Sequence, residues 1–121
     1  MPRVLVIDDD AALRRVLCIA LERAGFAVDT ADDGTTGMML FRALRPDLVI
    51  TDIRMPVKSG IEAVREIRAM EPTAPIIAIA GDYAGSGESL AAARALGADE
   101  VLAKPFSPAE LVERVIGRLG R

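Results

Sequence analysis

The sequence has 121 residues, 51% hydrophobic and 27% charged, with a formal net charge of −3. This length and balance predict one globular domain with a sizeable core and exclude a disordered chain. The acidic balance, the absence of a basic tract and the 3% aromatic content argue against a nucleic-acid-binding surface. Histidine is absent, which excludes histidine triads, histidine zinc sites and a phosphohistidine carried by these residues.

Cys18 is the single cysteine, so no internal disulfide is possible, as is typical of proteins in a reducing cytoplasm. No apolar run approaches the roughly 20 residues of a membrane span. The first residues lead directly into a strand-like run without the layout of a signal peptide. We therefore expect a cytoplasmic protein without a membrane segment.

Short β-branched runs alternate with segments of helical period along the whole sequence. We expect strands at about residues 3–7, 26–30, 47–51, 75–80 and 99–103. We expect helices from Asp10 to just before Gly25, over about 33–44, 61–70 and 89–96, and from Ser107 onward. This alternation predicts one α/β domain over residues 1–121, with a doubly wound, five-stranded parallel sheet.

Local patterns refine these elements. The first helix carries apolar residues at helical spacing, which predicts its core-facing side: Leu13, Val16, Leu17, Ala20, Leu21 and Ala24. Segment 26–30 alternates between apolar and polar residues, so we expect that strand at an edge of the sheet. Ser107, Pro108 and Glu110 have the pattern of a capped helix start.

Charged residues follow three of the expected strands. Asp8, Asp9 and Asp10 follow the first strand, Asp52 ends the third, and Lys104 follows the fifth. Because the carboxyl ends of parallel strands lie at one edge of a sheet, these side chains are expected to share a crevice. Clustered carboxylates repel one another unless a divalent cation binds them, and hard oxygen ligands favour Mg²⁺.

Such a crevice has the parts needed for phosphoryl transfer, which depends mainly on positioning and charge neutralisation. We interpret Asp52 as the nucleophile, Asp8 and Asp9 as metal-binding groups, and Lys104 as a fixed positive charge. A cis peptide bond between Lys104 and Pro105 would direct the lysine inward.

Four segments resemble the signature motifs of response-regulator receiver domains of two-component systems: 7–10, 50–56, 97–100 and 103–106. The resemblance extends over the whole sequence, and with no output segment recognisable it indicates a stand-alone, chemotaxis-regulator-like receiver, with the receiver portion of a longer regulator as the alternative. It implies a flavodoxin-like sheet of order 2-1-3-4-5 and transient phosphorylation of Asp52 by a phosphohistidine donor. The donor would be a sensor histidine kinase or a histidine phosphotransfer protein.

The resemblance also implies how Mg²⁺ is bound and what the protein is. Asp9, Asp52 and the backbone carbonyl of Arg54 would bind the ion, and Asp8 would act through water. The protein would be a signalling component and not an enzyme, apart from catalysing its own phosphorylation and dephosphorylation. Its output would be a phosphorylation-dependent contact with a downstream protein, without nucleic acid or membrane, by a monomer or weak homodimer.

The sequence departs from the receiver pattern at two positions. Ala80 stands where receivers usually have the Ser or Thr whose hydroxyl contacts the phosphoryl group, and Val101 replaces the aromatic switch residue. The backbone N–H of Gly81 could still contact a phosphoryl oxygen. We hypothesise that the signal is transmitted through the loop after the fourth strand, where Tyr83 or Ser86 could substitute for the missing groups.

Simpler interpretations remain open for several residues. An isolated acidic triplet usually only caps a helix. Arg14 and Arg15 are most simply solvated, although with Phe106 they could form a partner surface. Two other functions also remain: a pseudo-receiver that binds partners without phosphate, and a haloacid-dehalogenase-like phosphatase using Asp8 and Asp10.

Overall fold

The computed structural model describes residues 1–53, 60–80, 94 and 97–120. Its strands are β1 (Arg3–Ile7), β2 (Ala27–Ala31), β3 (Leu48–Asp52), β4 (Ile76–Ala80) and β5 (Glu100–Ala103). The helices with described bounds are α1 (Ala11–Arg23), α2 (Gly34–Leu44), α3 (Gly60–Met70) and α5 (Pro108–Leu119). The expected helix over 89–96 lies outside the described residues, apart from Arg94.

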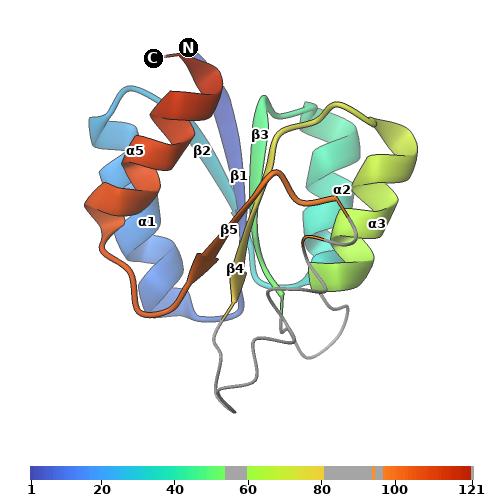
Figure 1. Ribbon diagram of the computed structural model, residues 1–121, viewed down its shortest axis with the longest axis horizontal. Helices are drawn as coiled ribbons and strands as arrows, with labels where there is room; N and C mark the ends of the chain where they lie inside the picture. The colour runs from blue at the N-terminus through green and yellow to red at the C-terminus, as the bar shows by residue number, and fades with distance from the viewer. Residues whose placement is uncertain (54–59, 81–93, 95–96, 121) are drawn as a thin grey trace.

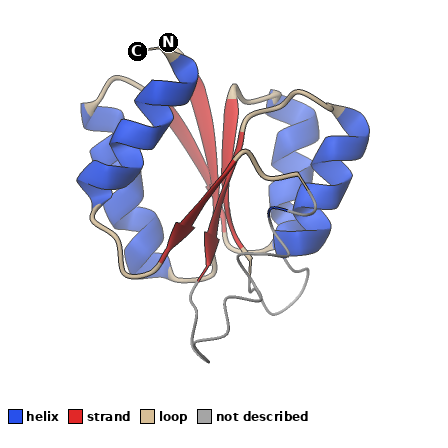
Figure 2. Cartoon of the chain, viewed as in Figure 1, coloured by secondary structure: helices blue, strands red, loops and turns tan. Residues whose placement is uncertain are grey.

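All five strands pair in parallel, in the order β2-β1-β3-β4-β5. This arrangement confirms the predicted flavodoxin-like topology, including the edge position of the strand with alternating polarity. Figure 2 shows the sheet as a central layer with helices on each side. Helices α1 and α5 cover one face, and α2 and α3 cover the other (Figure 1).

The two faces of the sheet carry separate hydrophobic cores. In β1, Val4 and Val6 pack toward α1 and α5, whereas Leu5 and Ile7 pack toward α2 and α3. Successive strand residues point to opposite faces, so a strand covered on both sides must be apolar at nearly every position. The nearly continuous apolar runs of β1, β3 and β4 therefore place these strands at the centre of the sheet.

Side-chain caps fix where the helices begin. Asp10 accepts hydrogen bonds from the amides of Ala12 and Leu13, and Asp33 accepts one from Thr36. Ser107 accepts one from Glu110 and so confirms the predicted start of the last helix. Among the described residues, no helix combines the length and the apolar character required to cross a membrane.

One prediction about the core face of α1 was wrong. Val16 is 44% exposed, whereas Leu17 and Leu21 are fully buried. Adjacent helical residues point about 100° apart, so Val16 and Leu17 cannot both point at the sheet. Packing of α1 against the sheet selects the stripe through Leu17 and Leu21.

Candidate functional site

Three acidic side chains meet at the carboxyl ends of β1 and β3. Each of Asp8, Asp9 and Asp52 places a carboxylate oxygen within 4.8 Å of the other two. The sheet register explains this meeting, because Ile7 pairs with Thr51 and so the next residue of each strand emerges at the same edge. Asp8 and Asp52 are buried, at 0% and 4% exposure, whereas Asp9 is exposed.

Lys104 directly follows the edge strand β5, and its side chain extends into the same crevice. Its Nζ donates a hydrogen bond of 2.9 Å to Oδ2 of Asp52. The backbone N–H of Lys104 continues the sheet by donating to the carbonyl of Ala80, and the peptide bond to Pro105 is cis. The structure thus brings together the three carboxylates and the amine that the sequence indicated.

The three consecutive acids Asp8, Asp9 and Asp10 have different structural roles. Asp8 continues the sheet through its amide, which donates to the carbonyl of Ala31. Its Oδ1 accepts a hydrogen bond of 2.9 Å from the amide of Asp10, whose own carboxylate caps α1. The simple capping interpretation therefore holds for Asp10 alone, and Asp8 and Asp9 face Asp52.

Asp8 has the character of a cation ligand. Its Oδ2 is buried and has no hydrogen-bond partner among the described residues. Burial, with a smaller effect from the nearby Asp52, raises the pKa of Asp8 from 3.8 to about 6, although the Asp10 amide lowers it. A buried carboxylate oxygen without a donor, beside two other carboxylates, fits a hard divalent cation such as Mg²⁺. Asp8, Asp9 and Asp52 are the residues that would bind it.

The β4 and β5 side of the crevice is apolar at the two switch positions. Ala80 is completely buried and packs with Ile53 and Ala78, and Val101 contacts the same cluster while partly exposed. No hydroxyl or aromatic ring occupies either position. The other residues predicted near this edge lie outside the described residues: Arg54, Gly81, Tyr83 and Ser86.

The residues predicted as a partner surface lie in different environments. Arg14 is half-buried, and its Nη1 donates a hydrogen bond of 2.7 Å to the backbone carbonyl of Asp8. Arg15 is exposed and makes no hydrogen bond or ion pair within the part of the chain that the structure describes. Phe106 packs partly against the core under α1 and α5. Only Arg15 therefore has the full exposure that was expected of a solvated arginine.

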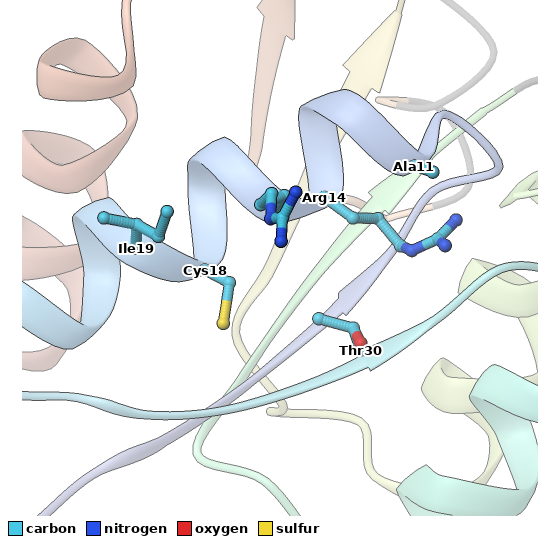
Figure 3. Close-up of a pocket in the computed structure, with 6 residues that line it drawn as sticks. Ala11, Arg14, Cys18, Ile19 and Thr30 are labelled. Carbon is cyan, nitrogen blue, oxygen red and sulfur yellow. The ribbon is translucent and has the colours of Figure 1, made fainter.

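Two surface hollows flank α1. A cavity of about 360 Å³ lies between this helix and β2 and is lined by Ala11, Arg14, Arg15, Cys18, Ile19 and Thr30. Figure 3 shows these lining residues. A second cavity of about 310 Å³ is lined by Val16, Ile19, Ala20, Arg23 and Pro108. Val16 and Ile19 are large apolar residues with 44% and 45% exposure, which the sequence analysis did not identify as surface features. Ile19 does not fall on the helical spacing of the core-facing residues of α1, and this apolar residue off the core face was the sequence signal for an exposed apolar side chain.

Comparison with known proteins identifies the family. The model of the response regulator receiver domain matches residues 4–116. The chain belongs to this family. Receiver domains act in two-component signalling, so this chain is a signalling domain and not a metabolic enzyme.

Similar sequences and solved structures support the same family assignment. The receiver domain is 40% identical to the DNA-binding response regulator MtrA of Mycolicibacterium paratuberculosis, covering 98% of this chain and 52% of that protein. It is also 40% identical to the transcriptional regulatory protein PrrA of Mycobacterium leprae, covering 99% of this chain and 51% of that protein. The chain thus spans about half the length of these relatives.

A solved structure of a CheY-like response regulator receiver domain protein from Methanospirillum hungatei superimposes with a TM-score of 0.91. The two sequences are 28% identical, and the match covers 99% of this chain and 94% of the other. This similarity extends the family assignment from the motifs to the entire fold.

Proposed function

We propose that this receiver domain accepts a phosphoryl group on Asp52 from a phosphohistidine of a sensor histidine kinase or histidine phosphotransfer protein. The observation that carries the proposal is the convergence of Asp8, Asp9 and Asp52 within 4.8 Å, with Nζ of Lys104 at 2.9 Å from Asp52. This arrangement combines a buried nucleophile, a set of oxygen ligands and a fixed cation in one crevice.

In this proposal a carboxylate oxygen of Asp52 attacks the phosphorus atom of the donor. The P–O bond to Asp52 forms as the P–N bond to the donor breaks, and the imidazole departs with the bond's electron pair. Bound Mg²⁺ supplies charge neutralisation for the phosphoryl oxygens. The ammonium of Lys104, already beside Asp52, provides a preorganised partner for another oxygen. We include the Arg54 carbonyl as a metal ligand beside Asp9 and Asp52, with Asp8 acting through water, and the Gly81 backbone N–H as a hydrogen-bond donor to a phosphoryl oxygen.

The proposed output is a phosphorylation-dependent contact with another protein, in the cytoplasm. MtrA and PrrA are named as a DNA-binding and a transcriptional regulator, and this chain spans about half of each. For these 121 residues, the net charge of −3 favours a protein contact over a nucleic-acid contact. The exposed Val16 and Ile19, with Arg15 beside them on α1, offer a surface on which a donor could dock.

A pseudo-receiver is the second candidate, and Ala80 and Val101 favour it. Without the hydroxyl and the aromatic ring, a receiver could bind partners in one fixed state. The intact acids and Lys104 favour phosphorylation instead. A haloacid-dehalogenase-like phosphatase is disfavoured, because the carboxylate of Asp10 is engaged in capping α1 and so is not available as a second catalytic acid.

The test is incubation with acetyl phosphate and Mg²⁺, followed by intact-mass analysis. We expect a mass increase of one phosphoryl group that is absent from Asp52→Asn and from a sample treated with EDTA. Asp32→Asn is the matched control, because Asp32 is an exposed acid just after β2 and is expected to leave the adduct unchanged. No adduct on the unsubstituted protein would favour the pseudo-receiver.

A further inference from the structure

Asp9 is the one acid of the β1–α1 turn whose side chain has no support of its own. The Asp8 amide is bonded to β2, and the Asp10 carboxylate is bonded to the first turn of α1. The Asp9 carboxylate is exposed and makes no hydrogen bond or ion pair within the described residues. Its direction is therefore set by the backbone from which it projects.

Arg14 holds that backbone. Its Nη1 lies 2.7 Å from the carbonyl oxygen of Asp8, the oxygen of the peptide that joins Asp8 to Asp9. A peptide group is planar, so fixing its oxygen fixes the orientation of the amide on which Asp9 begins. The turn is thereby restrained at the Asp8–Asp9 peptide, and the next peptide is held separately, because the Asp10 amide donates to the Asp8 carboxylate.

Helix geometry explains how Arg14 reaches this oxygen. Helical side chains lean toward the helix N-terminus, so an arginine in the second turn can reach the residues that precede the helix. Figure 3 shows the Arg14 side chain extending along α1 toward Ala11. Arg15, one position further, is exposed and has no such contact.

We propose that Arg14 is a positioning residue for the metal site, which it serves by orienting the Asp8–Asp9 peptide so that the Asp9 carboxylate faces Asp8 and Asp52. The inference rests on the proposed function, because it assumes that these acids bind Mg²⁺. If Arg14 acted only through its charge, its removal would change the Mg²⁺ affinity in the opposite direction. A cation near the site repels Mg²⁺, so removing charge alone would tighten binding.

The experiment measures Mg²⁺ affinity of the metal-free protein by calorimetric titration. In Arg14→Met, which keeps an unbranched apolar stem but loses the donor and the charge, we expect the dissociation constant for Mg²⁺ to rise about tenfold, as for other residues that support metal ligands. Arg14→Lys retains a donor and should recover most of the affinity. Arg15→Met removes the same charge from the adjacent, exposed residue, which has no contact with the turn, and should bind Mg²⁺ at least as tightly as the unsubstituted protein. Urea unfolding of each variant verifies that it is folded.

A second readout reports on the peptide itself. The amide ¹⁵N and ¹H shifts of Asp9 respond to the hydrogen bond accepted by the preceding carbonyl. They should move in metal-free Arg14→Met and remain in place in Arg15→Met. Unchanged or tighter Mg²⁺ binding by Arg14→Met would overturn the positioning role while leaving the phosphorylation of Asp52 intact. Failure of the unsubstituted protein to bind Mg²⁺ would overturn this inference and the proposed metal-dependent mechanism together.

Discussion

The crevice has two halves, which are both formed at the carboxyl ends of parallel strands but differ in side-chain chemistry. The acidic half is formed by Asp8 and Asp9, which follow β1, and by Asp52 at the end of β3, and it carries three converging carboxylates. The relay half, formed by Ala80 and Val101 on β4 and β5, carries only small apolar groups. Both halves end at the same edge of one sheet, so the topology does not dictate their chemistry. If Asp52 accepts a phosphoryl group as we propose, then accepting the group and transmitting its arrival would be separable properties of this fold.

Lys104 connects the two halves, and its removal should have the largest effect. Lys104→Ala deletes the ammonium 2.9 Å from Asp52 and leaves β5 in place. We expect phosphorylation by acetyl phosphate to slow about 100-fold, as when a preorganised charge-stabilising donor is lost. Quenched time points analysed by intact mass give the rate. Arg114→Ala is the control, because it removes a cation paired with Glu100, and it should leave the rate unchanged. An unchanged rate in Lys104→Ala would show that the Lys104 ammonium does not assist phosphorylation.

The buried charge of Asp8 should make the metal-free protein sensitive to pH. Because burial raises the pKa of Asp8 from 3.8 to about 6, the folded state binds this proton more firmly than the unfolded chain. The resulting stability is present below about pH 4 and is lost as the pH rises through about 6, roughly 3 kcal/mol in all. Asp8→Asn should remove this dependence and unfold at higher urea concentrations than the unsubstituted protein above pH 7.

Urea unfolding in EDTA across this range measures the effect. Asp32→Asn is the control, because it removes an exposed acid that is not part of the Asp8, Asp9 and Asp52 cluster. If the unsubstituted protein is equally stable at pH 4 and pH 7, or Asp8→Asn keeps the same slope, then Asp8 does not carry a buried charge.

Restoring a hydroxyl to the relay half should have the smallest effect. Ala80→Ser places an oxygen at the end of β4, where one hydrogen bond to a charged phosphoryl group contributes about 1.5 kcal/mol. We expect phosphorylation to accelerate at most about tenfold. Ala78→Ser is the matched control, since Ala78 is buried on the same face but lies further from the edge. A gain as large as the loss in Lys104→Ala would show that the halves are not separable.

Much of this molecule was predictable because its patterns are local. Alternation of apolar runs and helical periods located every described strand within about one residue, and the carboxyl-end rule placed Asp8, Asp52 and Lys104 at one edge. The start of α5 followed from Ser107 and Glu110, whose hydrogen bond lies within a single turn. Strand and helix positions depend on residues a few positions apart, and the meeting of the distant acids and the lysine follows from a general rule for parallel sheets, so the sequence is enough to predict both.

Other features required contacts between distant segments. Val16 and Leu17 are equally apolar, and only packing against the sheet decided that Val16 remains exposed. Arg14 and Arg15 are the same residue type, and only the fold determines that Arg14, and not Arg15, donates a hydrogen bond to the Asp8 carbonyl.

The sequence alone determined the fold class, the family resemblance and the identity of the converging acids, because hydrophobic period and strand-end position are encoded along the chain. The tertiary structure decided which of the three adjacent acids caps α1, which carboxylate oxygen is buried without a donor, and which arginine supports the turn. Those outcomes depend on burial and on distances across the sheet, which arise only when segments far apart in sequence pack together.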